Sequence, residues 1–89
     1  MLEIRQSNAF TRDFKKIKKQ GKNFDLLDEV VGLLEESAQL PKFYRNHKLT
    51  GDYKSYFELH VEPDWLLIYK IDATTLVLTR TGSHSELFA

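Results

Sequence analysis

The sequence contains no cysteine, which removes two common ways of stabilising a small protein. A disulfide framework and a thiolate zinc site are both excluded. A chain of 89 residues is expected to form a single domain, residues 1–89, with a small core. Its stability must therefore come from apolar packing or from contact with a partner protein, and the lack of thiols suits a reducing cytoplasm.

Long apolar runs are also missing. No stretch of about 18 apolar residues occurs, so we expect no transmembrane helix and no membrane partner. The opening residues, MLEIRQSNAF, lack the apolar run of a signal peptide. With only two prolines and four glycines, the chain shows no linker or low-complexity segment. These absences predict a cytoplasmic protein.

The chain has no net charge, but its charges are segregated. Residues 1–22 carry seven basic and two acidic side chains, a net charge of +5. Residues 23–40 carry five acidic side chains and no basic ones, a net charge of −5. Such a surface can hold nucleic acid on one side and repel it on the other. Alternatively, the basic segment is only a solvated helix face.

Apolar periodicity predicts a strand and two helices in the first half. Residues 2–7 alternate as in a strand. A helix is predicted over 9–20, capped by Ser7 or Asn8, with an apolar face of Phe10, Phe14 and Ile17. A second helix should run from 24 to 37 or 38, with an inner stripe of Leu27, Val30, Val31 and Leu34. Gly21 should end the first helix and Pro41 the second.

The second half predicts three strands, over 53–61, 65–71 and 75–81. In the first of them Tyr53, Phe57, Leu59 and Val61 share one face, which the helices should cover. His60 then points out of the opposite face, and Pro63 marks the connection to the next strand. We therefore predict an α+β fold in which an N-terminal strand and a helical hairpin pack on an antiparallel sheet of about four strands.

The reactive side chains of this half lie in the connection over 41–52, at strand ends, or just beyond the last strand. They are His47, His60, Asp64, Arg80 and His84. Histidines can act as base and acid near neutral pH, arginine can stabilise a pentavalent phosphate, and Trp65 or Phe88 can stack an unpaired base. Such a set suits cleavage of RNA, whose own 2′-hydroxyl is the nucleophile. No metal or cofactor is then required.

Each candidate also has a structural interpretation. The histidines are the type of residue that is often solvated or hydrogen-bonded, and Trp65 at a strand start often belongs to the core. Asp64 could be turn chemistry after Pro63, and Arg80 could pair with Glu58 or Glu62. A metal site made of His47, His60, His84 and Asp64 is a third reading, although their spacing matches no recognised metal signature.

Two long motifs carry a resemblance to a known family. NHKLTGDYKSYFELHVEPDWLLIYKI, followed by LTRTGSHSELF, resembles the YafQ-type branch of the RelE superfamily of bacterial type II toxins. The likeness runs from the first strand to the C-terminus and is most specific in HVEPDWLLIY and RTGSHSELF. It implies an antiparallel sheet packed against an N-terminal helical hairpin, in agreement with the predicted fold.

The resemblance also implies an activity. The family members are ribosome-dependent endoribonucleases, or mRNA interferases, which cut messenger RNA in the ribosomal A site and arrest growth. The implied partners are the ribosome, mRNA and a cognate antitoxin, a DNA-binding dimer that wraps the toxin with a partly disordered tail. A noncatalytic member that keeps the fold and the antitoxin or nucleic-acid contact is the rival reading.

Carried onto this sequence, the family's active-site set is His47, His60, Asp64, Trp65, Arg80, His84 and Phe88. By its chemistry His84 should be the general acid for the leaving 5′-oxygen, while His47, His60 or Asp64 takes or orients the 2′-hydroxyl proton. Arg80 should hold the phosphate, and Trp65 and Phe88 should shape the nucleotide pocket. Ribosomal RNA should contact the basic helix through Arg12, Lys15, Lys16, Lys18 and Lys19.

Overall fold

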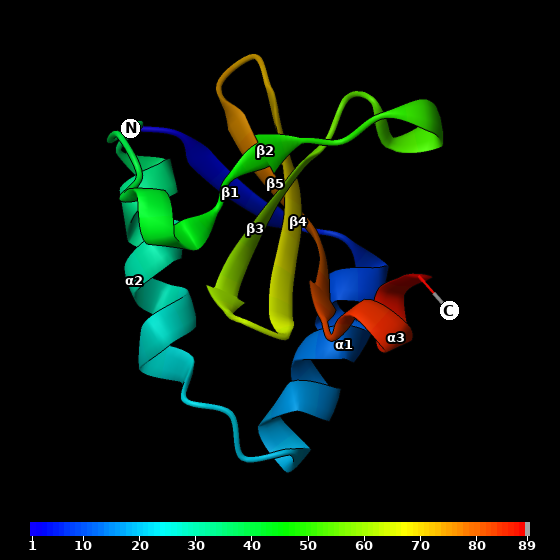
Figure 1. Cartoon of the computed structure of the whole chain (residues 1–89). Helices are drawn as coiled ribbons and strands as arrows, with labels where there is room; N and C mark the ends of the chain where they lie inside the picture. Colours follow the sequence, from blue (N-terminus) through cyan, green and yellow to red (C-terminus); the bar gives the residue numbers. More distant parts are fainter. Residues whose placement is uncertain (89) are drawn as a thin grey trace.

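The computed structural model describes residues 1–88 and has the predicted α+β fold class (Figure 1). Its elements are β1 (Glu3–Gln6), α1 (Asn8–Lys19), α2 (Phe24–Glu35), the 3₁₀ turn η1 (Lys42–Tyr44), β2 (His47–Lys48), the 3₁₀ turn η2 (Gly51–Tyr53), β3 (Phe57–Glu62), β4 (Trp65–Asp72), β5 (Thr75–Gly82) and α3 (His84–Phe88). Among these described residues, no helix has the length and apolar character needed to cross a membrane.

The sheet differs in detail from the prediction. It has five strands in the order β1-β5-β4-β3-β2, and β1 runs parallel to β5 while the other neighbours are antiparallel. The predicted fold class is confirmed, and two details differ from an antiparallel sheet of about four strands: β2 adds a fifth strand, and β1 runs parallel to β5. The two residues of β2 are too few to show a period, and the pairing of β1 depends on the path of the helices between the strands.

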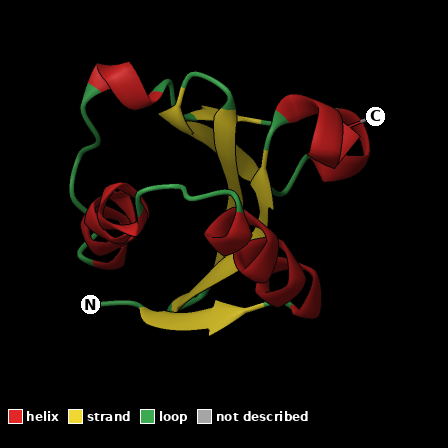
Figure 2. Cartoon of the chain, turned by 90° about the horizontal axis from the view of Figure 1, so that it is seen from below, coloured by secondary structure: helices red, strands yellow, loops and turns green. Residues whose placement is uncertain are grey.

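Both long helices begin at the expected places. Ser7 accepts a hydrogen bond from the N–H of Phe10 and caps α1, and Asn23 caps α2 through the N–H of Asp25. Figure 2 shows α2 and α3 on opposite sides of the strands, with a loop joining α1 to α2. The sheet therefore has α2 on one side and α3 on the other.

The end of α2 corrects one prediction. The helix stops at Glu35 rather than at 37 or 38, well before Pro41. Ser37 takes φ of 57°, and the N–H of Ala38 donates to the carbonyl of Leu33 at 2.9 Å, as in a Schellman motif. A local hydrogen-bonded cap therefore ends the helix, and Pro41 lies in the following connection.

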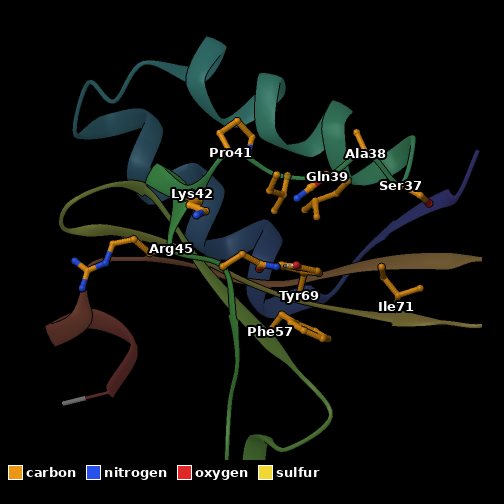
Figure 3. Close-up of a pocket in the computed structure, with 12 residues that line it drawn as sticks. Ser37, Ala38, Gln39, Pro41, Lys42, Arg45, Phe57, Tyr69 and Ile71 are labelled. Carbon is orange, nitrogen blue, oxygen red and sulfur yellow. Dashed lines mark hydrogen bonds between the residues drawn. The ribbon is translucent and has the colours of Figure 1, made fainter.

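That connection borders the largest cavity described in this structure, about 590 Å³, between the end of α2 and the sheet (Figure 3). Leu34, Leu40, Phe57, Tyr69 and Ile71 supply apolar walls. The Tyr69 hydroxyl donates to Asn46 Oδ1 at 2.7 Å, and burial raises the pKa of Tyr69. None of the predicted catalytic side chains lines this cavity.

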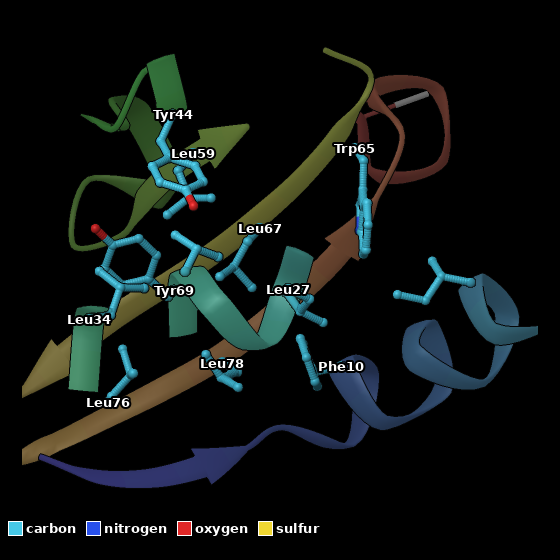
Figure 4. Close-up of a cluster of buried hydrophobic side chains, with 12 residues drawn as sticks. Phe10, Leu27, Leu34, Tyr44, Leu59, Trp65, Leu67, Tyr69, Leu76 and Leu78 are labelled. Carbon is cyan, nitrogen blue, oxygen red and sulfur yellow. The ribbon is translucent and has the colours of Figure 1, made fainter. Parts of the chain in front are cut away.

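The core fills the space between the long helices and the sheet (Figure 4). Its buried members include Phe10, Ile17, Leu27, Val30, Leu34, Leu59, Trp65, Leu67, Tyr69, Leu76 and Leu78. Leu59 lies in this cluster whereas His60 does not, which confirms that His60 faces away from the helices. Each buried leucine contributes about 1.5–3 kcal/mol by leaving water.

The strand predicted over 53–61 is shorter than expected, because β3 begins at Phe57. Tyr53 belongs to η2, and its side chain is exposed instead of lying under the helices. The ring of Tyr53 meets Phe88 edge-on, with centroids 6.3 Å apart. The start of this predicted strand is therefore a turn that reaches toward α3.

Candidate active site

The predicted catalytic side chains meet on the face of the sheet that the long helices leave open. Strand register places Glu58, Ile68 and Arg80 in one row across β3, β4 and β5, with His47 opposite Glu58 on β2. The next row holds His60 and Leu66, and it ends at Gly82, which leads into α3. Residues that are distant in sequence are therefore neighbours here because adjacent strands lie about 4.8 Å apart.

The first pair of histidines flanks a buried carboxylate. Glu58 is only 6% exposed, and its Oε1 lies 3.4 Å from His47 Nε2 and 4.0 Å from His60 Nε2. His47 donates its Nδ1–H to the carbonyl of Arg45 at 2.8 Å, because a carbonyl can only accept. His60 is held in the same way by the carbonyl of Pro63 at 3.2 Å.

The third histidine completes the cluster from α3. The rings of His84 and His60 have centroids 5.7 Å apart. The backbone N–H of His84 and its Nδ1 lie 3.2 and 3.3 Å from Asp64 Oδ1. The backbone hydrogen bond, with help from the side-chain one, lowers the pKa of Asp64. All three imidazoles are thus anchored through Nδ1; Nε2 of His47 is directed to Glu58, and Nε2 of His60 and His84 are left for chemistry.

A second carboxylate fixes α3 itself. Glu86 accepts from the Ser83 N–H at 2.9 Å, and its own N–H donates to Ser83 Oγ, forming a capping box. Its other oxygen accepts from Gln20 at 3.0 Å and pairs with Lys16 at 3.2 Å. These contacts, the backbone one first, lower the pKa of Glu86 to about 2. The end of α1 therefore holds the helix that carries His84.

Gly82 allows this close approach. It takes φ of 154°, and a Cβ atom there would lie 3.0 Å from Glu86 Oε1. Any larger residue would push against the capping box and move the start of α3. The glycine of the RTGSH motif thus has a steric reason in the structure.

Arg80 is held by a partner that the sequence did not indicate. Its Nε and Nη2 donate to the two oxygens of Asp13 on α1 at 2.6 and 3.1 Å, which raises the pKa of Arg80. The alternatives of pairing with Glu58 or Glu62 were wrong. The other N–H groups of its guanidinium do not bond to Asp13 and can donate to a ligand.

A register shift decides the face on which Arg80 lies. Leu78 pairs with Tyr69 and Arg80 pairs with Ile68, so Thr79 is an extra residue in β5. Without this bulge, Arg80 would follow Leu78 onto the core side, because alternate residues share a face. The hydroxyl of Ser7 donates to the Thr79 carbonyl at 2.7 Å and holds the bulge against the start of α1.

The two predicted nucleotide-binding aromatics differ in position. Phe88 is 45% exposed and its ring lies 6.4 Å from that of His84, so it can meet a base. Trp65 is fully buried, and its Nε1–H donates to Thr81 Oγ1 at 2.9 Å. A ring with no exposed surface cannot stack on RNA. The predicted substrate-binding role of Trp65 is therefore corrected to a core role.

The predicted RNA contacts lie on the solvent side of α1. Arg12, Lys15, Lys16, Lys18 and Lys19 are all exposed, while Phe10 and Ile17 of the same helix are buried. Figure 1 shows α1 beside α3. The basic side chains therefore flank the helix that carries His84, and Lys16 is in addition tied to Glu86.

Three residues of the site were not among the predicted ones: Glu58, Asp13 and Glu86. Glu58 precedes His60 by two positions in a strand, and this spacing already places both on one face. Glu86 follows Ser83 in the S-x-x-E pattern of a capping box. No local pattern indicates Asp13, because its role depends on the packing of α1 against β5.

The cluster also has the donor set of a metal site. Ligand atoms of Glu58, His60 and His84 lie within 4.8 Å of one another. Two imidazoles and a carboxylate are ligands that zinc and copper accept. The metal site considered from the sequence also contained His47 and Asp64, which lie outside this group. It did not contain Glu58, which belongs to it. The same nitrogens thus suit proton transfer or metal binding.

Comparison with known proteins bears on both readings. The family described as "Bacterial toxin of type II toxin-antitoxin system, YafQ" matches residues 2–89. The mRNA interferase toxin YafQ of Escherichia coli strain K12 is 39% identical over 87 residues, covering 97% of this chain and 95% of the relative. One chain of a solved E. coli DinJ–YafQ complex is 38% identical to this chain. The match covers 100% of each of these two chains, with a TM-score of 0.91.

A third comparison concerns metals. A metal-bound toxin from Helicobacter pylori is 44% identical, covers 99% of this chain and 100% of its own, and superposes with a TM-score of 0.93. These likenesses extend over nearly the whole chain. They confirm the family predicted from HVEPDWLLIY and RTGSHSELF.

Proposed function

The chain belongs to the YafQ family of bacterial type II toxins, and we propose that it is a cytoplasmic, ribosome-dependent endoribonuclease that cleaves translated mRNA. Residues 1–89 form the toxin domain. Cleavage uses the RNA 2′-hydroxyl as nucleophile and requires no metal or cofactor. The outcome in the cell is inhibited translation and growth arrest.

The observation that carries this proposal is the common anchoring of the three histidines. Each Nδ1 lies against an oxygen, which leaves Nε2 of His60 and His84 to meet a substrate, while Nε2 of His47 lies 3.4 Å from Glu58. Attack of the 2′-hydroxyl on the phosphate requires a neutral imidazole to take the hydroxyl proton and a protonated imidazole to give a proton to the leaving 5′-oxygen. With ring centroids 5.7 Å apart, His60 and His84 are close enough for one phosphate in front of them to contact both imidazoles.

The contacts suggest a role for each group. His60 accepts the 2′-hydroxyl proton at Nε2, with Glu58 stabilising the cation that forms. His84 gives a proton from Nε2 to the leaving 5′-oxygen, and Asp64 orients its ring. The free N–H groups of Arg80 hold the phosphate, and Phe88 stacks on a base. His47 contacts the same Glu58 carboxylate from β2 and helps to hold it in place.

Partners follow from charge and kinship. The exposed lysines of α1 can bind ribosomal RNA near α3, because phosphate contacts dominate such binding. The E. coli relative is known in a complex with DinJ. By analogy this toxin is neutralised by a cognate antitoxin that binds it, carries the DNA-binding function and represses the shared operon.

The test is to induce the chain alone and map mRNA ends, with His84→Ala as the matched variant. We expect growth arrest with codon-phased cuts, which the variant loses by a factor of roughly 10² to 10⁴. Single-turnover cleavage on ribosomes should follow a bell-shaped profile between roughly pH 5 and 8. Arrest without new cuts, or unchanged arrest in the variant, would favour a noncatalytic member of the fold.

A second candidate activity is metal binding at Glu58, His60 and His84, which the H. pylori structure favours. A metal binds the lone pair of a neutral imidazole, so it would occupy the Nε2 atoms that proton transfer needs. Cleavage should therefore survive EDTA and fall when Cu²⁺ is added. Loss of cleavage in EDTA and recovery with a divalent ion would instead assign the metal to catalysis.

A further inference from the structure

We propose that a cavity on the outer side of His60 is a second RNA-binding site, which takes one unpaired base next to the scissile phosphate. The cavity measures about 300 Å³ and is lined by Phe43, Arg45, His60, Val61, Glu62 and Pro63. This volume is at the lower end for small-ligand sites. The inference rests on the ribonuclease function proposed above and adds a nucleotide subsite to it.

Phe43 provides the stacking surface. It is 72% exposed, although phenylalanine is usually buried, and it is the most exposed aromatic side chain among residues 1–88. Its neighbour Tyr44 is only 4% exposed and belongs to the core, with its ring centroid 4.4 Å from that of Phe43. The buried tyrosine anchors η1, so Phe43 is presented to solvent from a fixed base rather than from a loose loop.

Arg45 provides a hydrogen-bond donor. Its φ of 53° lies in the left-handed region, which is uncommon for a non-glycine residue and is often found at functional sites. This conformation directs its carbonyl to His47 Nδ1 at 2.8 Å. Arg45 lines the larger cavity beside α2 as well, and Figure 3 shows its guanidinium extending away from the other side chains of that cavity. Within residues 1–88 its guanidinium forms no ion pair.

The charge of the cavity favours a base over a phosphate. Glu62 and Arg45 both line the cavity, so its lining carries one negative and one positive side chain. A phosphate or an acidic peptide would face repulsion from Glu62. A nucleobase instead offers acceptors to arginine and amino protons to glutamate, the pairings by which proteins read base edges.

His60 joins this cavity to the catalytic cluster. Its ring is a wall of the cavity, while its Nε2 lies toward Glu58 and its centroid is 5.7 Å from that of His84. A phosphate that contacts both His60 and His84 would therefore place a flanking base beside Phe43. The base on the other flank can meet Phe88, so the two aromatics bracket the cleavage point.

The test compares Phe43→Trp, Phe43→Leu and Phe43→Ala, with Ile4→Ala as control, because Ile4 is an exposed apolar residue on the opposite edge strand. One readout is NMR titration with a 2′-O-methylated trinucleotide, which cannot be cleaved. The other is single-turnover cleavage on programmed ribosomes, with an intact mRNA or with an abasic position on either side of the scissile bond.

We expect wild type, Phe43→Trp and Ile4→Ala to bind alike, and Leu and Ala at position 43 to bind about 5- to 150-fold more weakly. On ribosomes the Ala variant and one abasic mRNA should each slow cleavage, and their combination should be no slower than either alone. Leu behaving like wild type in both readouts would overturn the subsite. A variant that cleaves normally but binds antitoxin poorly would overturn it too, and assign Phe43 to that partner.

The two proposals fail separately. If the wild type binds the trinucleotide through Phe43 but does not cut mRNA, the subsite stands and the ribonuclease function falls. If the wild type cuts mRNA and the trinucleotide leaves the Phe43 ring signals unchanged, the ribonuclease function stands and the subsite falls.

Discussion

Asp64 is exposed, and its importance lies in the two N–H groups that His84 directs to one of its oxygens. These hydrogen bonds lower the pKa of Asp64, so the group is ionised throughout the neutral range. An ionised acceptor fixes the tautomer of His84 with the proton on Nδ1. The Asp64 carboxylate therefore fixes the ring orientation of His84, whereas the backbone carbonyl of Pro63 fixes that of His60.

Asp64→Asn tests this role. The amide can still accept a hydrogen bond but no longer carries charge, so we expect cleavage to slow by about 10-fold, less than the roughly 10²-fold or greater loss for His84→Ala. Single-turnover rates on ribosomes provide the measurement. Asp72→Asn, at the exposed end of β4, is the control and should cleave normally. A rate for Asp64→Asn equal to that of wild type would remove Asp64 from the site.

At the scale of elements, α3 is the least self-sufficient part of the site. It has five residues, and a helix this short has no stability of its own. Its position depends on the capping box of Ser83 and Glu86 and on the link from Glu86 to α1. His84 and Phe88 both lie on this element, so its placement affects proton transfer and base contact together.

Glu86→Ala should therefore reduce activity without touching a catalytic group. Loss of a cap costs about 1 kcal/mol, so we expect roughly 5-fold slower cleavage and faster amide exchange in α3. Glu86→Gln keeps an acceptor for the Ser83 N–H, so its cleavage rate and its amide exchange should lie between those of wild type and of Glu86→Ala. Glu36→Ala, at the exposed end of α2, is the control. Unchanged exchange in α3 with Ala at position 86 would show that other contacts hold the helix.

The start of α1 and the bulge of β5 hold each other in place through Ser7. Ser7 accepts the N–H of Phe10 at 2.9 Å and donates to the Thr79 carbonyl at 2.7 Å. One side chain thus caps a helix and holds the register shift that turns Arg80 toward the site. The ion pair of Arg80 with Asp13 crosses the same junction.

Ser7→Ala should cost about 1–2 kcal/mol of unfolding free energy, since both hydrogen bonds are lost. Urea denaturation at neutral pH measures this. Ser55→Ala, at an exposed turn position, should stay within about 0.5 kcal/mol of wild type. Equal midpoints for the two variants would mean that the junction is held by Asp13 alone.

For the whole molecule, carboxylates with lowered pKa values make stability depend on pH. Glu86, with a pKa of about 2 against 4.5 for a free side chain, binds fewer protons folded than unfolded. Its contribution is therefore fully present above pH 4.5 and is lost as the pH falls toward 2. Asp64 acts in the same direction, because its pKa is also lowered.

Acid titration of stability should show this sign. At neutral pH we expect wild type to be more stable than Glu86→Gln by up to about 1 kcal/mol, because Gln keeps an acceptor for the Ser83 N–H but loses the charge that lowers the pKa of Glu86. The difference should shrink steadily below pH 4.5. Unfolding free energies from urea curves at several pH values measure it. A difference that grows as the pH falls would contradict the assigned cause.

The segregation of charge also becomes meaningful only for the whole molecule. The basic side chains of α1 lie on the surface next to α3, while the acidic α2 lies on the other side of the strands from α3. RNA that approaches α1 would therefore meet His84 and Phe88 without passing the acidic helix. Charge and site share one side of the protein.

The sequence by itself determined the α+β class, both long helices, the buried strands and the face of His60, because these follow from local periods and caps. Its motifs also determined the family. Where a cap lacked its usual residue, as with Ser37 at the end of α2, the boundary was missed. Where alternation was read through a turn, as at Tyr53, the strand was made too long.

Only the tertiary structure decided the direction of β1, the bulge at Thr79, the partner of Arg80 and the burial of Trp65. Each of these depends on contacts between residues far apart in the chain, and no local period records them. The same holds for the site: the sequence named three histidines, and packing placed Glu58 between two of them and Asp64 against the third. The proximity that chemistry requires is therefore a property of the assembled sheet and α3.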